Sequence, residues 1–535
     1  MSRVVRRAPS LGGLAGAVVF FCLALSPSLV PRHWLLQGVV AGVTAAIGYG
    51  VAALLSAWAG PVLTPRGRGI AWRVLAVAGA ALCAVALLAS AGWQRDIRRL
   101  MGMDTDVEWH LPLIVIVAVV TFALLLLLAR SMRLGTRKLI GLLERFVPRW
   151  AAVAAGLVVA ALLTLLFVND FLYSRFLGLM NETAALTDRG TSEGITRPAS
   201  DLLSGGPGSL MDWDGLGSKG RDFVGSALTP AAIGAFAGRP ALAPIRVYAG
   251  LRSAGSFEEQ ARLAVRELER TGAFDRSVLA IMGTTGTGWV NENVADALEY
   301  LRGGDTAMVA MQYSYLPSWV SFLVDRTKAA QAGTALVHAV HARWAALPAG
   351  DRPKLVLFGE SLGSYAAEAA FTDVTDVLAT VDGALLVGPP NMNPIWSALT
   401  ARRDPGSPMW RPVYNGGADV CFAQFPADLA RPGCRVVYLQ NASDPITWWN
   451  PQLLYRRPGW LDDPYGPDVT PAMRWFPVVT FWQVVVDLMF SDDVPPGHGH
   501  RFGSNVVDGW VAIIPPPGWT RDDTARLKHI IDARH

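Results

Sequence analysis

Serine, aspartate and histidine, the three residue types that together carry out nucleophilic acyl chemistry, follow one another in that order in the C-terminal half of the chain. The serine is Ser361, in the run Gly359-Glu360-Ser361-Leu362-Gly363, which fits the pattern GxSxG. A serine hydroxyl attacks a carbonyl efficiently only when a histidine removes its proton and an acid orients that histidine. Ser361 is therefore the candidate nucleophile, and its partners are sought later in the chain.

The residues on either side make this motif more specific than a chance match. The apolar run 355–358 predicts a strand that leads into it, and the alanine-rich run 364–370 predicts a helix that leaves it. A strand, a tight turn and a helix form a nucleophile elbow, in which glycines permit the strained turn. The amide of Leu362, at the start of the helix, would then donate to an oxyanion. A purely structural serine turn is the alternative.

Asp444 is the candidate acid. It lies in Asn441-Ala442-Ser443-Asp444-Pro445, directly after a predicted strand at 435–440. Where a nucleophile elbow is present, the acid follows a later strand and the histidine comes after the acid. An aspartate before proline is also a common turn residue, so a structural role stays open.

The candidate base lies in the glycine-rich run Pro496-Gly497-His498-Gly499-His500. We select His500 as the base and keep His498 as the alternative. Two neighbouring histidines can also bind zinc, but no third ligand stands nearby at helical spacing, and no metal site is predicted. The remaining late histidines, His529 and His535, lie in a polar tail and are expected to be solvated.

A second oxyanion donor is expected in the run 283–289, Gly-Thr-Thr-Gly-Thr-Gly-Trp, which follows an earlier predicted strand. A loop after an early strand commonly supplies this donor, and we select the backbone amide at Thr285. The run superficially resembles a phosphate-binding loop, but no lysine follows its glycines. No cofactor is implied.

A parallel sheet must position these residues, because strands and helices alternate from about residue 243. Alternation with nearly continuous apolar strands predicts an α/β fold, a mostly parallel sheet covered by helices. The predicted strands are 245–249, 277–282, 307–313, 354–358, 383–387 and 435–440. Between the candidate acid and base, the tryptophan-rich stretch 446–495 contains the apolar run 476–490. It predicts either a buried helix or a lid beside the site.

The composition indicates a membrane domain ahead of the sheet. The chain is 52% hydrophobic and 17% charged, whereas soluble domains carry about 25% charged residues. Five apolar stretches, at 11–30, 35–58, 71–92, 111–129 and 151–169, approach the roughly 20 residues that cross a bilayer. We expect an all-α transmembrane bundle of about five helices over 1–175, then a linker or overlying loop-rich segment over 176–242, then a catalytic domain over 243–535.

The placement of arginine and lysine predicts the orientation of this bundle. Basic residues are concentrated before the first stretch, between the second and third, and between the fourth and fifth. The positive-inside rule places these segments and the N-terminus in the cytoplasm, and the region after residue 170 outside the plasma membrane. In that oxidising setting, Cys421 and Cys434 are expected to form a disulfide, with two unrelated thiols as the alternative.

The motifs also resemble a known family. They are similar to those of a bacterial, largely actinobacterial, α/β-hydrolase family, in which a multi-span N-terminal domain precedes a hydrolase domain of uncharacterised substrate. The stretches that carry the resemblance are Ser28-Leu29-Val30-Pro31-Arg32, Pro244-Ile245-Arg246-Val247-Tyr248, Thr284-Thr285-Gly286-Thr287-Gly288-Trp289, Gln312-Tyr313-Ser314-Tyr315-Leu316-Pro317-Ser318, the elbow, Ser443-Asp444-Pro445 and Gly497-His498-Gly499-His500. The resemblance implies the α/β-hydrolase fold and a serine-hydrolase mechanism.

Together these observations predict a membrane-embedded serine hydrolase, of esterase, lipase or thioesterase type, or an acyltransferase. Its expected partners are an acyl ester at the cell envelope, with lipid as one candidate, and membrane lipids. The net charge of +4 over 535 residues gives no indication of a nucleic-acid partner. The alternative from another class is a membrane transport or assembly protein whose hydrolase-like domain serves for binding.

Overall fold

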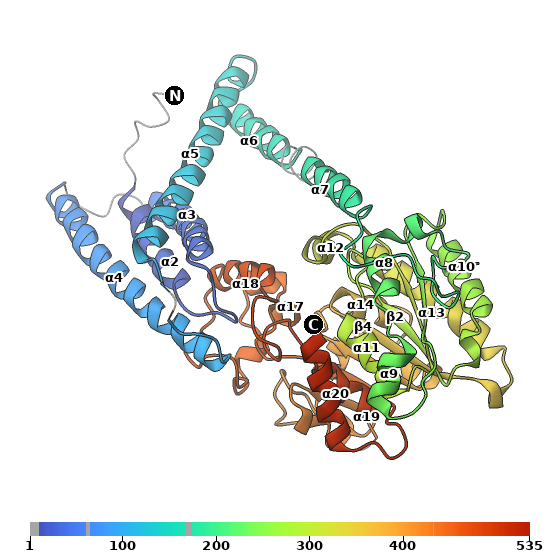
Figure 1. The fold of residues 1–535 in the computed structure, drawn as a ribbon. Helices are drawn as coiled ribbons and strands as arrows, with labels where there is room; N and C mark the ends of the chain where they lie inside the picture. Colours follow the sequence, from blue (N-terminus) through green and yellow to red (C-terminus); the bar gives the residue numbers. More distant parts are fainter. Residues whose placement is uncertain (1–9, 60–64, 107, 167–173, 432, 535) are drawn as a thin grey trace. The chain divides into compact units, whose positions relative to one another are not determined.

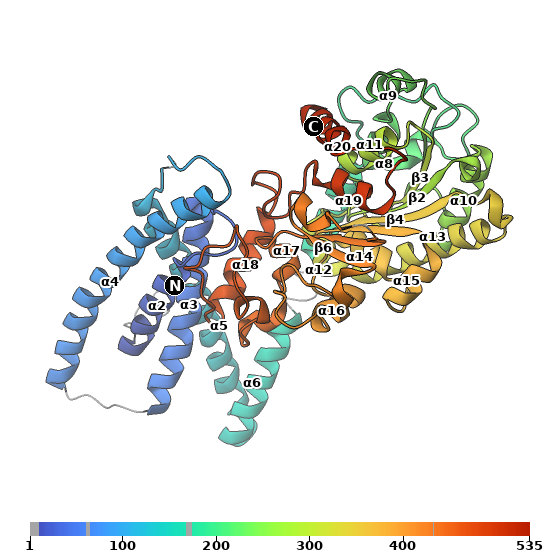
Figure 2. The ribbon, with the colours of Figure 1, turned by 90° about the horizontal axis from the view of Figure 1, so that it is seen from below.

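The described residues form two compact units, shown in Figures 1 and 2. The computed structural model describes residues 1–535 except 1–9, 60–64, 107, 167–173, 432 and 535. The first unit consists of the chain up to Leu179 together with Pro451–Leu461 and Pro467–Phe490, and the second contains the remainder. The division therefore differs from the expected contiguous domains, because most of the stretch between the candidate acid and base belongs to the N-terminal unit.

A parallel sheet organises the second unit. Among the described residues it has seven strands in the order β1-β3-β2-β4-β5-β7-β6, and every pairing is parallel. The strands are β1 (Ile245–Ala249), β2 (Val278–Gly283), β3 (Thr306–Met311), β4 (Lys354–Glu360), β5 (Gly383–Val387), β6 (Val420–Ala423) and β7 (Val436–Leu439). Their residues are almost all buried, as expected of a sheet covered on both faces. Six strands lie where the sequence predicts them, and the edge strand β6 was not predicted.

Helices cover both faces of the sheet, as Figure 2 shows. One face carries α10 (Phe257–Arg270), α13 (Arg326–Ala345) and α14 (Leu362–Glu368), and the other carries α8 (Gly217–Gly225), α11 (Glu292–Leu301) and α19 (Asn505–Ile513). The other helices of this unit are α9 (Pro230–Ala237), α12 (Ser318–Val324), α15 (Val374–Thr380), α16 (Pro394–Ala401), α17 (Pro445–Trp448) and α20 (Arg521–Arg534). Short 3-10 turns lie at Trp213–Leu216, Ala273–Asp275, Ala349–Asp351, Asn415–Gly417 and Pro426–Leu429.

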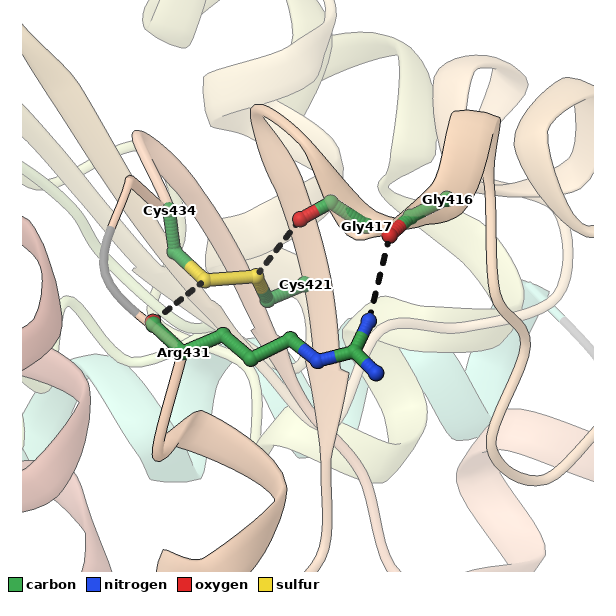
Figure 3. Close-up of a disulfide and its surroundings, with 5 residues drawn as sticks. All are labelled: Gly416, Gly417, Cys421, Arg431 and Cys434. Atoms are coloured by element: carbon green, nitrogen blue, oxygen red, sulfur yellow. Dashed lines mark hydrogen bonds between the residues drawn. A yellow bond between two sulfur atoms is a disulfide. The ribbon is translucent and has the colours of Figure 1, made fainter.

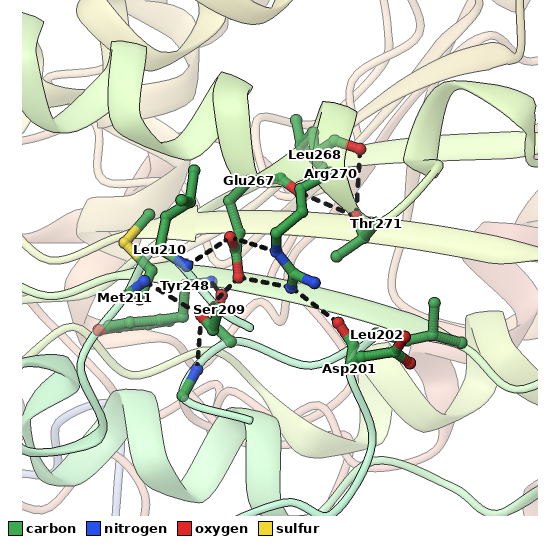
Figure 4. Close-up of polar contacts among 12 residues, drawn as sticks. Asp201, Leu202, Ser209, Leu210, Met211, Tyr248, Glu267, Leu268, Arg270 and Thr271 are labelled. Atoms are coloured by element: carbon green, nitrogen blue, oxygen red, sulfur yellow. Dashed lines mark hydrogen bonds and ion pairs between the residues drawn. The ribbon is translucent and has the colours of Figure 1, made fainter. Parts of the chain in front are cut away.

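The segment ahead of β1 is attached to this sheet domain rather than forming a free linker. Figure 4 shows Glu267 of α10 at the centre of its contacts. The Leu210 amide donates to Glu267 at 2.9 Å, and Arg270 joins Glu267 to the carbonyl of Asp201 at 2.7 Å. The segment also pairs with β1, where the Ser204 amide donates to the carbonyl of Arg246 at 3.1 Å. The sequence left open a linker or a loop-rich segment that overlies the next domain, and these contacts agree with the second.

Long apolar helices make up most of the first unit. The described residues contain four helices long and apolar enough to cross a membrane. They are α3 (Trp34–Ala59), α4 (Pro65–Leu100), α5 (Leu111–Leu143) and α6 (Arg149–Leu166), and α7 (Ser174–Thr187) follows. The first expected stretch is instead a helix of 14 residues, α2 (Leu11–Ala24). It ends before Ser26-Pro27 because proline disfavours helical geometry at the preceding residue.

The C-terminal part of the first unit is a short helix docked on the N-terminal ones. Helix α18 (Val479–Met489) packs against α2 and α3, and Figure 1 shows it beside them. Val479 and Val486 of α18 are buried with Ala24, Val40 and Ala41. The 3-10 turns Pro451–Leu454 and Gly459–Leu461 belong to the same unit. Of the two readings of this apolar run, the structure shows the buried helix.

Cys421 and Cys434 are joined in a disulfide, shown in Figure 3. Cys421 lies on β6, and Cys434 lies two residues before β7 begins. The bond therefore closes the loop between the two strands at this edge of the sheet. Cys22 and Cys83 are free thiols on α2 and α4.

Candidate active site

Ser361 occupies a strained turn at the carboxyl end of the central strand β4. Its backbone has φ 54° and ψ −127°, a conformation that residues other than glycine rarely adopt. Helix α14 begins at the next residue, so strand, turn and helix form the predicted elbow. A Cβ on Gly359 would lie 2.4 Å from the carbonyl oxygen of Gly363, which explains the need for glycine there. The Ser361 amide donates to the carbonyl of Val387 at 2.9 Å and ties the turn to β5.

Leu362 and Thr285 are the two candidate oxyanion donors. Leu362 is the first residue of α14, where a helix leaves its amides without partners inside the helix. The amide of Thr285 donates to the carbonyl of Trp289 at 3.1 Å and is already engaged. The Thr285 hydroxyl is buried and has no hydrogen-bond partner among the described residues. The structure thus keeps Thr285 at the site but changes the candidate donor from its amide to its hydroxyl.

Asp444 lies in the loop after β7, as predicted. It is fully buried, and it caps helix α17 by accepting from the amide of Ile446 through Oδ1 at 2.8 Å. Its other oxygen, Oδ2, lies 2.7 Å from Nδ1 of His500. Asp444 therefore caps a turn and also contacts the candidate base, the two positions that the sequence left open.

His500, not His498, meets the acid. Two backbone amides hold the loop that carries His500. The Gly499 amide donates to Ser443 Oγ at 2.8 Å, and the His500 amide donates to the carbonyl of Ser491 at 2.8 Å. His498 pairs instead with Arg501 in an isolated bridge. The structure places these two histidines differently, a distinction that neither their spacing nor their glycine neighbours could make.

Ser361 and His500 converge on the end of β5. The backbone of Ser361 bonds to Val387, and the ring of His500 packs on the next residue, Gly388. A Cβ on Gly388 would lie 2.4 Å from Cε1 of His500, so only glycine leaves room for the ring. The Nε2 atom of His500 is buried and has no hydrogen-bond partner within the described part of the chain.

A cleft of about 890 Å³ opens at these residues, all of them in the second unit. Its lining includes Ser361, His500 and Thr285, together with Trp289, Glu360 and Asp492. The candidate nucleophile, the candidate base and one candidate oxyanion donor therefore line one cleft, while Asp444 contacts the histidine outside that lining.

Carboxylates dominate the electrostatics around the base. Burial alone would lower the pKa of His500, but the charge and hydrogen bond of Asp444 and the charges of Asp492 and Glu360 raise that pKa to about 9. Burial raises the pKa of Glu360 to about 7, against the opposing effects of His500 and of a hydrogen bond from Asn291 at 2.6 Å. Sequence reasoning missed Glu360, Asn291 and Asp492. Glu360 had one signal, its place beside the nucleophile within the motif.

Among the described residues, no group of three or more His, Cys, Asp or Glu side chains is placed to hold a metal ion. The zinc alternative for the two late histidines therefore gains no ligand set from the structure.

Comparisons with known sequences cover most of the chain in two pieces. Residues 245–527 match the sequence model described as the alpha/beta-hydrolase family, and residues 25–227 match the one described as the alpha/beta-hydrolase family N-terminus. No curated protein matches the chain. No solved structure matches it either.

Proposed function

The chain belongs to the alpha/beta-hydrolase family, and from this premise we propose that it is a membrane-anchored serine hydrolase or acyltransferase acting on acyl esters. One observation carries the proposal: Nδ1 of His500 lies 2.7 Å from Asp444, and the same ring lines a cleft with the strained Ser361. A binding module does not require a buried base held by an acid beside a strained serine. This geometry supports acyl transfer over a binding role.

The proposed reaction has two halves. Ser361 Oγ attacks the acyl carbonyl while His500 Nε2 takes its proton, and Asp444 stabilises the imidazolium through Nδ1. The Leu362 amide and the Thr285 hydroxyl donate to the oxyanion. The C–O or C–S bond to the leaving group breaks, and His500 returns the proton to the alcohol or thiol. Water or an acceptor hydroxyl then attacks the acyl-serine by the reverse proton path.

We also place the cleft outside the cytoplasm, on the basis of chain connectivity. Helix α18 has 11 residues, too few for the roughly 20 that cross a bilayer. The stretch 467–490 must therefore enter and leave on the side that carries the second unit. Because α18 bonds to Arg32, the loop between α2 and α3 lies on that side. Four helices then follow, α3 to α6, and an even number of crossings returns the chain to the same side.

The basic residues assign that side. Arg66 and Arg68 lie at the start of α4, Arg145 lies between α5 and α6, and Arg149 is the first residue of α6. In the proposed arrangement all four lie at the ends of the helices away from the loop between α2 and α3. Basic connections face the cytoplasm. The disulfide of the second unit supports an oxidising compartment. The proposed location is a plasma membrane, with the hydrolase unit facing outward and an acyl ester of the envelope, lipid included, as substrate.

Fluorophosphonate labelling of the purified full-length protein tests the activity. We expect wild type to be labelled, Ser361→Ala to remain unlabelled, and His500→Gln to react about 10⁴-fold more slowly, because the hydroxyl loses its base. His498→Gln is the matched control, since it removes the neighbouring histidine, and it should keep most of the rate. A folded wild type that takes up no label would contradict the proposal and favour a binding role for the domain.

A further inference from the structure

We infer that Arg32 and Asp487 are positioning residues of the reaction: their buried ion pair docks α18 on the N-terminal helices and thereby fixes the loop that carries His500. The inference rests on the proposed function and deepens it, because it gives the N-terminal unit a part in catalysis beyond anchoring. Both residues lie in the first unit, so the contact is internal to that unit.

Asp487 is bound from two directions. One carboxylate oxygen lies 2.8 Å from Nε of Arg32, and the other accepts from the amide of Leu29 at 3.2 Å. The Arg32 and Asp487 side chains are 1% and 0% exposed. Buried charges occur in proteins when they are paired and hydrogen-bonded, and removing one member leaves the other uncompensated. The pair is therefore specific to this one docked position of α18.

The rest of the loop between α2 and α3 is organised around the same contact. Arg32 also donates from Nη1 to Gln37 at 3.0 Å and from its amide to Gln94 at 3.0 Å. It thereby joins α3 and α4 to α18. The loop bearing Ser28-Leu29-Val30-Pro31-Arg32, a motif that the proposed chemistry leaves unused, is the receptor for α18.

A second polar contact lies one turn earlier on α18. Gln483 stands four residues before Asp487, so both side chains share one face of the helix. Its amide donates to the carbonyls of Ala24 at 3.2 Å and Ser26 at 2.9 Å. Carbonyls at a helix C-terminus lack partners inside the helix, and Gln483 supplies one for the end of α2. Val479 and Val486 add an apolar contact on the same side.

The docked helix leads directly to the base. Helix α18 ends at Met489, and Ser491 lies two residues further along the chain. The carbonyl of Ser491 accepts from the His500 amide at 2.8 Å. A Cβ on Gly499 would lie 2.4 Å from that same carbonyl oxygen, so the loop packs closely on Ser491. Asp492, the next residue, lines the cleft. Asp487 lies four residues before Ser491, so the proposed path from the ion pair to His500 runs along the chain itself.

The test uses the full-length protein in detergent with a short-chain p-nitrophenyl ester as probe. The variants are Arg32→Gln, Asp487→Asn and the double variant, which contains no buried unpaired charge. We expect kcat to fall about 10- to 100-fold with KM little changed, because small displacements of a base are costly. The double variant should lose no more than either single variant, because all three remove one interaction.

The pH profile separates positioning from loss of stability. When segment 491–493 is released, Asp492 no longer stands beside His500, and the pKa of the imidazole falls. The pH at which kcat rises, the alkaline limb of the profile, should therefore move down by about one pH unit. Thr44→Val is the matched control: Thr44 is buried in α3, but its hydroxyl bonds only to carbonyls of its own helix. It should leave the limb in place.

Each outcome decides the inference. Folded pair variants with wild-type kcat and pH limb would overturn it, as would a control that changes both in the same way. If even the double variant fails to fold, the pair serves folding and the positioning role is overturned. A wild type that takes up no fluorophosphonate refutes the proposed function itself. Labelling of wild type and pair variants at equal rates overturns only the inference.

Discussion

At the scale of single residues, His500 is the proposed base, and its acidic neighbours raise its proton affinity. Asp444 bonds to Nδ1 of His500, and Asp492 and Glu360 line the same cleft as the imidazole ring. Burial lowers the pKa of the imidazole, and these carboxylates together raise it to about 9. Only the neutral imidazole can take the proton of Ser361. Most of the free enzyme should therefore be inactive at neutral pH.

This arrangement predicts an alkaline pH dependence. The rate of ester cleavage should rise with pH as His500 loses its proton, and the midpoint of this rising limb should lie near pH 9. Glu360→Gln keeps the acceptor that Asn291 uses but removes one charge that favours the imidazolium. Its limb should therefore lie at lower pH, and its rate at pH 7 relative to its own plateau should increase. The measurement is kcat/KM across the alkaline range for both proteins.

Glu368→Gln is the control for that experiment. Glu368 lies on α14 after the nucleophile, and burial also raises its pKa to about 7, against hydrogen bonds from Asn393 and Tyr438. The carboxylates that raise the pKa of His500 are instead Asp444, Asp492 and Glu360. A limb that moves equally in both variants would show that general destabilisation, rather than the charge of Glu360, controls the base.

The sequence predicted the members of this site but not their atoms. Ser361, Asp444 and a histidine at position 498 or 500 follow from chain order, because the elbow fixes which elements must precede and follow it. Thr285 was selected for its amide, and the turn closed by Trp289 uses that amide. Side-chain and backbone donors of one residue have the same place in a sequence, so only coordinates separate them.

At the scale of elements, local pattern was sufficient where the pattern was long. Six strands and the helices between them were predicted because each apolar run is bounded by turn residues. Strand β6, Val420–Ala423, has four residues at the edge of the sheet and gives too short a pattern. The first apolar stretch was predicted too long, since Pro27 ends α2 although apolar residues continue beyond it.

The end of β5 predicts a sharp effect of one methyl group. Gly388 has φ 52°, and a Cβ there would lie 2.4 Å from the ring of His500. In Gly388→Ala the base must move, so kcat should fall about 100-fold. The left-handed backbone adds a cost of about 1–2 kcal/mol to folding. The measurements are esterase kcat and the midpoint of thermal unfolding.

Gly406→Ala separates the two costs. Gly406 has φ 87°, but nothing lies within 4 Å of the position of an added Cβ. This variant should lose comparable stability while keeping its kcat. Equal loss of kcat in both variants would mean that the methyl group of Gly388→Ala acts through stability and not through the base.

At the scale of the whole molecule, the feature that sequence could not supply is the most distant contact. Arg32 and Asp487 are 455 positions apart, and no local period relates them. The sequence contains both ends: an arginine in a short loop between apolar stretches, and an aspartate that interrupts the apolar run 476–490. Taken alone, the first is only a charge in a loop and the second only a polar interruption of an apolar run. Their pairing also makes the region between acid and base part of the N-terminal unit, against the contiguous domain expected for it.

The same contact yields a test of topology, because in the proposed arrangement the loop bearing Arg32 and the hydrolase unit share one side of the membrane. Tyr455 and Phe146 are 71% and 79% exposed, and they lie on opposite sides in the proposed arrangement. Single cysteines at these positions, in a Cys22→Ala, Cys83→Ala background, should differ in reaction with a membrane-impermeant maleimide on intact cells. Tyr455→Cys should react at once, and Phe146→Cys only after permeabilisation, because basic connections stay in the cytoplasm. The disulfide occupies Cys421 and Cys434 and keeps them out of the signal. The reverse labelling would place the cleft in the cytoplasm, and labelling of both sites on intact cells would mean that α3 to α6 do not separate them.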